Sequence, residues 1–413
     1  MEKVYERCCG LDVHKKTVVA CLRTPGARGR RTSEVRTFGT MTPELLALAD
    51  WLLEAGCTHV AMESTGVYWK PVFNILEGVC EVLLVNAHHI KAVPGRKTDV
   101  KDCEWIADLL EHGLLRASFI PPPPIRELRD LTRYRRALIA QRATEANRVQ
   151  KLLETANIKL GSVAADVLGK SGRLMLKALI AGERDGTRLA ELAKGPLRKK
   201  REALAPALTG RFTAHHAFLL GQLLAHMDEL EAHIAQFDTQ IEETLRPFAQ
   251  VPLELLQTIP GVGQRTAEVI LAEIGVDMRR FPTAAHLASW AGMCPGNNES
   301  AGKRKSGKTR KGDRYLRTAL IEAAWAASHS RHTYLASLYA RIARRRGAKK
   351  AAVAVGHSIL VAVWHILRKG VPYADLGPSH FDRLNTERLT RHYLRRLEDL
   401  GLQVTVQPLP EAA

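Results

Sequence analysis

Four consecutive prolines at residues 121–124 divide the chain into two parts of different character. Proline fixes φ and has no backbone N–H, so such a run forms a stiff break of polyproline type. Strand-like and helix-like segments alternate before the break, whereas helical patterns dominate after it. Because 413 residues are too many for one ordinary core, we expect two or three domains, with a boundary at these prolines.

Before the proline run, the hydrophobic patterns predict the element order β-β-β-α-β-α-β-α. Thr42 is the expected N-cap of the first helix, with Pro43 in its first position. A short buried strand, the fourth, ends at Glu63. This order is that of a ribonuclease-H-like, or RuvC-like, mixed α/β sheet. The predicted segments are residues 4–13, 17–22, 35–38, 42–53, 59–62, 69–76, 81–85 and 99–115.

After the prolines, residues 126–160 combine an apolar stripe with many arginines and are predicted to be helical. Further on, seven apolar residues recur at spacings of three and four, which is typical of a coiled coil. Three arrangements remain open: a helix packed within its own domain, a hairpin with the arginine-rich helix, or a dimer seam. The seven residues are Leu220, Leu223, Met227, Leu230, Ile234, Phe237 and Ile241.

Residues 257–274 read as a helix, a Gly-Val-Gly turn and a second helix, which resembles a helix-hairpin-helix element. Gly261 and Gly263 would let backbone N–H groups approach a phosphate at a helix N-terminus. A purely structural turn between two helices is the alternative. More helices are predicted at 315–339 and 351–367, and we interpret the apolar 351–367 segment as a buried helix, since a membrane span needs about 20 apolar residues.

The charge balance points to a polyanionic partner. Lys and Arg number 61 against 43 Asp and Glu, which leaves a formal charge of +18, and the basic residues occur in runs. DNA or RNA is the commonest partner of such a chain. The seven cysteines include no CxxC pair, and the N-terminus has no apolar stretch long enough for a signal peptide. We therefore expect a cytoplasmic, nucleoid-associated protein with reduced thiols and no membrane contact.

Four carboxylates stand where a ribonuclease-H-like sheet would bring them together: Asp12, Glu63, Asp99 and Asp102. Asp12 interrupts an apolar strand, and Asp99 and Asp102 are three residues apart on one helix face. Such a cluster can hold Mg²⁺ or Mn²⁺ for chemistry at a phosphodiester. Taken alone, Asp99 could be an N-cap, Asp102 could favour the helix dipole, and Glu63 could be a turn residue.

A glycine- and lysine-rich insert at 292–312 contains Ser300. By composition alone, this is an unremarkable serine in a solvated loop. Ser306 also stands before a glycine, but the distance from Pro295 favours Ser300. The insert also carries Lys303, Arg304, Lys305, Lys308, Arg310 and Lys311, which would hold DNA near the serine.

Taken together, these segments resemble the insertion sequence 110 family of transposases, which also contains the Piv-type DNA invertases. The resemblance covers residues 8–330. It is carried by LDVHK at 11–15, MESTG at 62–66, KTDVKD at 97–102, IPGVG at 259–263, the loop from Pro295 to Gly302, and Gly312 with Leu316-Arg317.

The resemblance implies an RNA-guided recombinase. In such an enzyme, Ser300 would attack a phosphate activated by metal on the four acids, giving a covalent 5′-phosphoserine and a free 3′-OH. A structured guide RNA would select donor and target DNA, and Arg129, Arg133 and Arg136 of the arginine-rich helix suit contacts to its backbone. Because two DNA partners require four cuts, a homodimer or tetramer is expected.

The expected domains are a catalytic domain at 1–120, a helical RNA-binding or dimerisation region at 121–250, a helical transposase domain with the serine at 251–370, and an extension at 371–413. Two other classes remain open. A RuvC-like structure-specific endonuclease would use the carboxylates alone, and a non-enzymatic binding protein would use only the basic helices and the Gly-Val-Gly turn. Within the family, the chain could also be a site-specific invertase.

Overall fold

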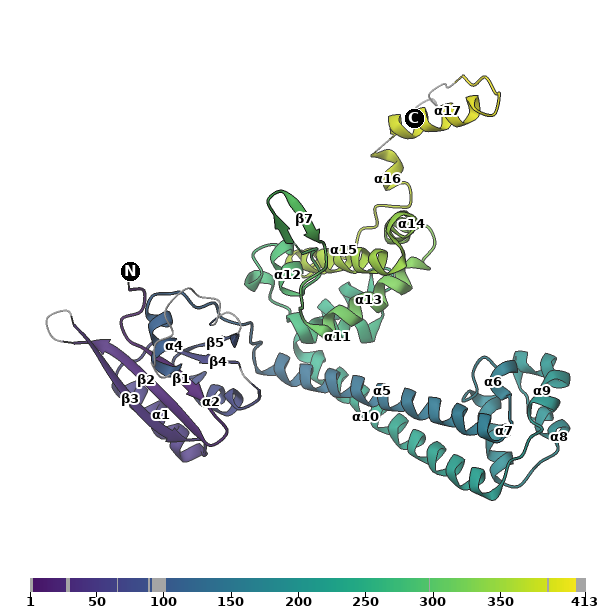
Figure 1. Cartoon of the computed structure of the whole chain (residues 1–413), viewed down its shortest axis with the longest axis horizontal. Helices are drawn as coiled ribbons and strands as arrows, with labels where there is room; N and C mark the ends of the chain where they lie inside the picture. Colours follow the sequence, from purple (N-terminus) through teal and green to yellow (C-terminus); the bar gives the residue numbers. More distant parts are fainter. Residues whose placement is uncertain are drawn as a thin grey trace. The chain divides into compact units, whose positions relative to one another are not determined.

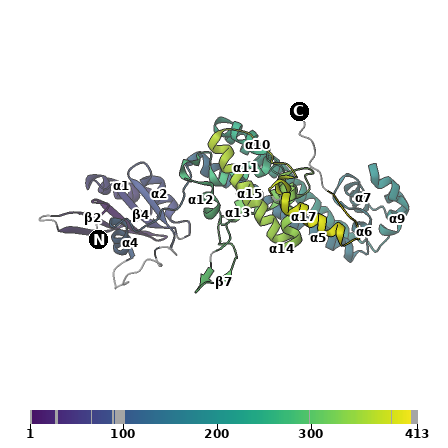
Figure 2. The same ribbon diagram turned by 90° about the horizontal axis from the view of Figure 1, so that it is seen from above.

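The computed structural model describes residues 3–26, 30–64, 66–87, 90, 102–296, 298–384 and 386–405. The chain divides into two compact units, Met1–Ile120 and Pro121–Ala413. Each unit has its own hydrophobic core, so each is described by itself (Figures 1 and 2).

The first unit is built on a five-stranded mixed sheet in the order β3-β2-β1-β4-β5. Strands β1 to β3 are antiparallel neighbours, whereas β4 is parallel to both β1 and β5. The strands are β1 (Cys8–Val13), β2 (Thr17–Pro25), β3 (Arg31–Gly39), β4 (His59–Glu63) and β5 (Glu81–Val85).

Helices cover both faces of this sheet. Helices α1 (Thr42–Glu54) and α2 (Trp69–Leu76) pack with Leu11, Val60 and Met62 on one face. Helix α4 (Asp102–Glu111) lies on the other face, where its apolar residues meet Cys8, Ala61 and Val85. Because neighbouring residues of a strand point to opposite faces, the side chain at each strand position is assigned to one of these two layers.

The predicted element order of the first unit is confirmed within the described residues, with corrections at several element ends. The second strand continues to Pro25 rather than ending at residue 22, and the third extends over Arg31–Gly39 rather than 35–38. The first strand begins at Cys8 rather than at residue 4. Met41, not Thr42, is the N-cap of α1, since its backbone is extended and its carbonyl accepts the N–H groups of Glu44 and Leu45. Helix α4 ends at Glu111 instead of residue 115, because Gly113 takes a φ of 65°.

The second unit is organised around two long antiparallel helices, α5 (Pro123–Thr155) and α10 (Ala214–Gln257), which lie side by side in Figure 1. Leu138 of α5 packs with Leu230 and Ile234 of α10. Of the three arrangements left open for the seven apolar residues of α10, the structure therefore has the hairpin with the arginine-rich helix. Five of the seven stripe residues are buried, and Leu223 and Phe237 are partly buried against the same cores.

The arginine-rich helix begins earlier and ends earlier than predicted. The last two prolines of the run form its first turn, where a missing N–H costs nothing. It ends at Thr155 rather than 160, and Asn157 then takes a φ of 58°. Five short helices pack against the far ends of α5 and α10: α6 (Leu160–Val163), α7 (Lys170–Ile180), α8 (Gly186–Glu191), η2 (Gly195–Lys200) and α9 (Arg201–Ala207).

Beyond α10, a helical body carries one small hairpin of strands, β6 (Asn298–Ser300) and β7 (Lys303–Ser306). The helical stretch predicted at 315–339 forms two helices, α13 (Arg314–Ser328) and α14 (Tyr334–Arg346), because His332 takes a φ of 61° between them. The remaining elements are α11 (Gln264–Ile274), η3 (Met278–Arg280), α12 (Ala284–Trp290), α15 (Ala348–Lys369), α16 (His380–Arg383) and α17 (Thr386–Glu398).

Helix α15 is the one described helix that is long and apolar enough to cross a membrane. It contacts α12, α13 and α14 and buries Val355, Ile359 and Val363. These contacts are those of a core helix, as the sequence predicts for this segment.

Candidate carboxylate and serine sites

Asp12 and Glu63 lie next to each other at the ends of adjacent parallel strands. The register of β1 and β4 pairs Leu11 with Met62, and each acid is the next residue of its strand. Leu11 and Met62 point into the core beneath α1, so both acids point toward the face that carries α4.

A glycine brings α4 close to this strand end. A Cβ on Gly10 would lie 2.2 Å from the carbonyl oxygen of Cys103 and 2.4 Å from the backbone N of Ala107. Strand β1 therefore packs backbone to backbone against α4, whose first residue is Asp102. Burial raises the pKa of the Cys103 thiol to about 11, and the negative charge of Asp12 adds to this rise. Asp12 thus lies near the first turn of α4.

Two of the four predicted acids, Asp12 and Glu63, are neighbours at one edge of the sheet, and Asp102 is the first residue of the helix that packs against β1. Asp99 lies outside the described residues. In the part of the chain that the structure describes, no group of three or more His, Cys, Asp or Glu is close enough to hold a metal ion. The complete four-carboxylate cluster therefore stays a prediction.

His14 is a further residue of this edge that the sequence reasoning missed. Its Nε2 lies 3.1 Å from a carboxylate oxygen of Asp12, and both side chains are reached by solvent. The spacing of two residues along an extended segment, which places both side chains on one face, was the available signal. A histidine here can orient the Asp12 carboxylate by hydrogen bonding.

A buried acid anchors the other end of α4. Glu111 is 1% exposed, and its carboxylate lies 2.8 Å from both Arg23 of β2 and Arg31 of β3. Although burial alone favours the neutral form, the two guanidinium groups lower the pKa of Glu111. This ion cluster holds α4 on the sheet and so fixes the position of Asp102.

Ser300 lies at the tip of the β6–β7 hairpin, next to its two-residue turn. The turn residues Ala301 and Gly302 have φ values of 50° and 71°, the left-handed combination that suits a tight hairpin. Ser300 pairs with Lys303 across the turn and is exposed. Ser306 lies at the other end of the hairpin, where its Oγ accepts the N–H of Lys308 at 3.2 Å. The fold therefore distinguishes the two serines: Ser300 is presented at the tip.

Close backbone contacts hold the insert at its base. A Cβ on Gly292, whose φ is 66°, would lie 2.7 Å from the backbone N of Gly312. Higher up, the N–H of Gly296 donates to the carbonyl of Lys308 at 3.1 Å. Arg317 donates to the carbonyl of Gly292 at 3.2 Å. The hairpin therefore extends from a closed base, and Figures 1 and 2 show it projecting from the helical body of its unit.

The cations of the insert face solvent. No ion pair joins any of them to a carboxylate of the described residues, and the side chain of Arg304 lies outside the description. The exposed cations are Lys303, Lys305, Lys308, Arg310 and Lys311.

Comparison with known proteins matches two separate parts of this chain. Residues 9–158, which include Asp12, Glu63 and Asp102, match a transposase domain of the DEDD type found in IS110 elements. Residues 253–340, which include the serine hairpin, match a domain described as the transposase of the IS116/IS110/IS902 family. The chain belongs to the IS110 family of transposases.

Curated relatives agree with this assignment. An IS110 insertion-element protein of 43.6 kDa from Streptomyces coelicolor is 29% identical over 69% of this chain and 74% of its own length. A putative transposase from Sinorhizobium fredii is 29% identical over 61% of this chain and 60% of its own length. A pilin gene-inverting protein from Moraxella lacunata is 30% identical over 34% of this chain and 45% of its own length.

The arginine-rich helix of the transposase forms ion pairs within its own unit, and its predicted contact with nucleic acid stays a prediction. Arg129 and Arg133 both contact the carboxylate of Glu273, a residue of α11 with 0% exposed side chain, at 3.0 and 2.8 Å. Arg133 also contacts Asp313, the N-cap of α13, at 3.2 Å. Arg136 has a looser, more exposed pair with Glu322 at 3.4 Å. Arg129 and Arg133 thus brace α5 against α11 and α13, near the base of the serine hairpin.

The two glycines of the Gly261-Val262-Gly263 turn have different surroundings. A Cβ on Gly261 would lie 2.3 Å from the carbonyl oxygen of Ala323, so this glycine permits close packing on α13. Gly263 is the N-cap of α11, and the space around its Cα is open. The structural interpretation of the turn therefore accounts for Gly261.

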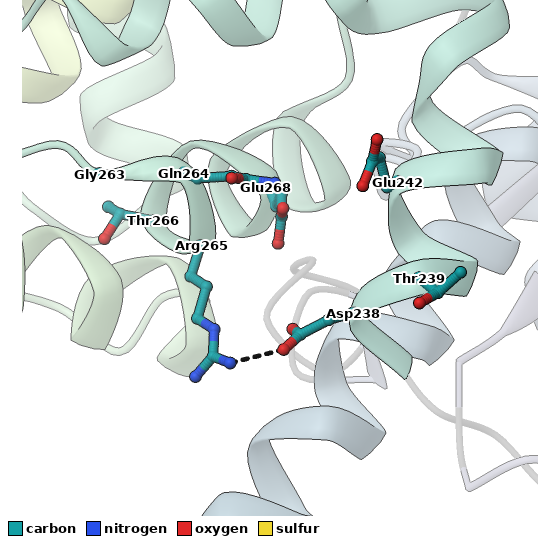
Figure 3. A pocket seen from close by; sticks show the side chains of 8 residues that line it. All are labelled: Asp238, Thr239, Glu242, Gly263, Gln264, Arg265, Thr266 and Glu268. Carbon is teal, nitrogen blue, oxygen red and sulfur yellow. Dashed lines mark hydrogen bonds and ion pairs between the residues drawn. The ribbon is translucent and has the colours of Figure 1, made fainter. Parts of the chain in front are cut away.

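Gly263 opens into a pocket of about 580 Å³ between α10 and α11 (Figure 3). Three carboxylates line it, those of Asp238, Glu242 and Glu268, and Arg265 pairs with Asp238 at 2.5 Å. Arg135 also pairs with both Asp238 and Glu268, so cations compensate two of the three carboxylates. The predicted phosphate contact at Gly263 stays a prediction.

Proposed function

We propose that the first unit is a ribonuclease-H-like catalytic domain. The strand order β3-β2-β1-β4-β5, with three antiparallel strands followed by two parallel ones, is the arrangement this fold requires. Its acids belong at the carboxyl ends of the central strands, where Asp12 and Glu63 lie in register.

Asp12, Glu63 and Asp102, together with Asp99, would hold a divalent metal ion, Mg²⁺ or Mn²⁺. Carboxylate oxygens are the donors that these hard cations prefer, and the strand register places two of them side by side. A bound ion would neutralise charge on a phosphodiester and make its phosphorus easier to attack.

Ser300 is the proposed nucleophile. Its Oγ attacks the phosphorus of one DNA strand, a Ser–O–P bond forms, and the P–O3′ bond breaks. The serine proton ends on the departing 3′ oxygen, which leaves a 5′-phosphoserine and a free 3′-OH. Attack by the 3′-OH of another strand reverses the step and returns the proton to Ser300. Strands can therefore be exchanged without an external energy source.

The exposed cations of the insert supply the charge that holds DNA at this serine. Lys303 lies directly across the turn from Ser300, so a phosphate at the tip would meet an ammonium group. This placement, an exposed serine at the hairpin tip beside exposed cations, is the observation that carries the proposal.

A structured guide RNA and a homodimer or tetramer complete the proposed function. The excess of basic residues, +18 in all, is more than the hairpin alone accounts for. We assign RNA binding or self-association to the helical region at 121–250, and the serine step to the region at 251–370. Donor and target DNA each need two cuts, which requires more than one copy of the chain.

The decisive experiment traps the covalent intermediate. Purified protein is incubated with labelled element-end DNA and Mg²⁺, then denatured, and the adducts are resolved by electrophoresis. Ser300→Ala is expected to abolish the adducts and keep DNA binding, whereas Ser306→Ala is expected to keep both. Asp12→Asn should also abolish adducts, because it removes a metal-binding carboxylate.

Adducts that persist in Ser300→Ala would overturn the proposal. Free cut ends without any adduct would instead indicate the endonuclease alternative. The likeness to a pilin gene-inverting protein favours one further variant of the function, site-specific inversion. A plasmid with two inverted element ends distinguishes inversion from transposition. Inversion reverses the segment between the ends, whereas transposition moves it to new DNA.

A further inference from the structure

Helices α13 and α14 expose a tryptophan that folding does not account for. Trp325 is 50% exposed, although the opposite side of α13 is fully buried. A tryptophan ring offers a large flat face that a partner can cover, and this residue is common at binding interfaces.

Two further rings lie against Trp325. His329, the C-cap residue of α13, stacks on it at a centroid distance of 5.9 Å and an interplanar angle of 18°. Tyr339 of α14 contacts it at 5.9 Å and 43°. Trp325, His329 and Tyr339 together form an aromatic platform on one side of the two helices.

Exposed cations follow Tyr339 along α14. The last turn of α14 and the start of α15 carry exposed basic residues, and none of them pairs with a carboxylate of the described residues. Arg346 follows Tyr339 by two helical turns and so shares its face. One acid is near, Glu322, and Arg136 at 3.4 Å compensates its charge. The exposed cations are Arg344, Arg345, Arg346, Lys349 and Lys350.

We propose that this platform binds an unpaired strand of DNA, with bases stacked on Trp325 and phosphates held by the α14 arginines. Aromatic side chains stack on any base whose face is free, whereas the base faces of a duplex are covered. Strand exchange exposes such bases at each break. Trp325 is ~16 Å along α13 from Arg314, where the helix begins after the serine insert.

This inference rests on the DNA substrate of the family and not on the serine chemistry. Binding is therefore measured without divalent metal, by fluorescence anisotropy of three labelled 12-nucleotide probes: single-stranded DNA, duplex DNA and single-stranded RNA. Trp325→Ala is expected to weaken binding of single-stranded DNA about ten-fold, the usual loss for one stacked base. Binding of duplex DNA is expected to stay unchanged.

Two variants separate stacking from loss of structure. Trp325→Phe keeps an aromatic face and is expected to recover most of the affinity. Phe218→Ala removes another exposed ring, 65% exposed on α10, and is expected to change nothing. Unchanged melting temperatures would show that all three variants fold.

The proposal is overturned if Trp325→Ala leaves binding of single-stranded DNA unchanged or weakens all three probes equally. A loss confined to RNA would also overturn it and assign the platform to RNA. So would a lower oligomer mass of Trp325→Ala in light scattering, because the ring would then be covered by a second copy of the chain. Each outcome is independent of whether Ser300 forms an adduct.

Discussion

Helix α5 and the β6–β7 hairpin both carry dense runs of basic residues, but their surroundings differ. On α5, Arg135 is 3% exposed and contacts Glu268 at 2.6 Å and Asp238 at 2.8 Å. Around the hairpin, Lys303 and Lys305 are exposed and pair with no described carboxylate. The same residue type therefore holds helices together in one region and remains available to a ligand in the other.

The difference follows from burial. A cation that is removed from water needs a carboxylate partner, because an uncompensated buried charge costs several kcal/mol. Each arginine that packs between α5 and its neighbours therefore has such a partner, as Arg129 and Arg133 have in Glu273. A two-stranded hairpin buries almost nothing, so its lysines keep their water and their full charge. Charge density alone does not identify a DNA-binding surface.

The largest expected effect tests the internal role of α5. Glu273→Ala leaves Arg129 and Arg133 facing each other without their shared carboxylate. We expect a loss of about 3 kcal/mol in the free energy of unfolding, measured by urea denaturation. Glu322→Ala is the matched control, because this glutamate is 62% exposed and its pair with Arg136 should contribute less than about 1 kcal/mol. Equal losses in the two variants would contradict the comparison.

A second prediction concerns the hairpin. Lys303→Ala combined with Lys305→Ala is expected to weaken DNA binding. The slope of log K against log salt should also become shallower, by about 0.9 for each phosphate that the protein no longer neutralises. Arg142→Ala with Arg148→Ala, which removes two ion-paired arginines of α5, should leave that slope unchanged. If the salt dependence became shallower only in the α5 variant, the DNA-binding cations would lie on α5 and not on the hairpin.

The smallest expected effect comes from glycine substitutions, which should change stability in opposite directions in the hairpin and in α5. Ala301 has a φ of 50°, a conformation that costs a side chain about 1 kcal/mol, so Ala301→Gly should stabilise the hairpin by that amount. Ala143→Gly, at an exposed position inside α5, should instead destabilise by about 1 kcal/mol. Hydrogen exchange of the local amides measures the change in local stability that each substitution causes. If glycine destabilised the hairpin as it does α5, the left-handed turn geometry at Ala301 would be refuted.

The sequence predicted the first unit well because its signals are local. Helix α2 and strand β5 have the predicted bounds, since each is an apolar block between turn residues. Asp12 and Glu63 could be paired because an element order of this kind specifies which strands are neighbours. Asp102 followed from its place at the start of a helix.

The internal ion pairs of α5 were not predicted because they depend on distant residues. The arginine pattern is visible in the sequence, but Glu273 lies more than a hundred positions away and reaches Arg133 only after α11 packs on α5. The same limit applies to Trp325, which becomes a candidate only when α13 buries its opposite side and leaves this ring exposed.

The amino-acid sequence by itself determined the element order, the acids at the strand ends and the family to which the transposase belongs. Each depends on residues close together in the chain or on short motifs. The tertiary structure decided which cations are exposed, which serine lies at the hairpin tip, and that Gly261 serves packing. These properties depend on burial and on the partner across an interface, and a side chain acquires both only when distant segments meet.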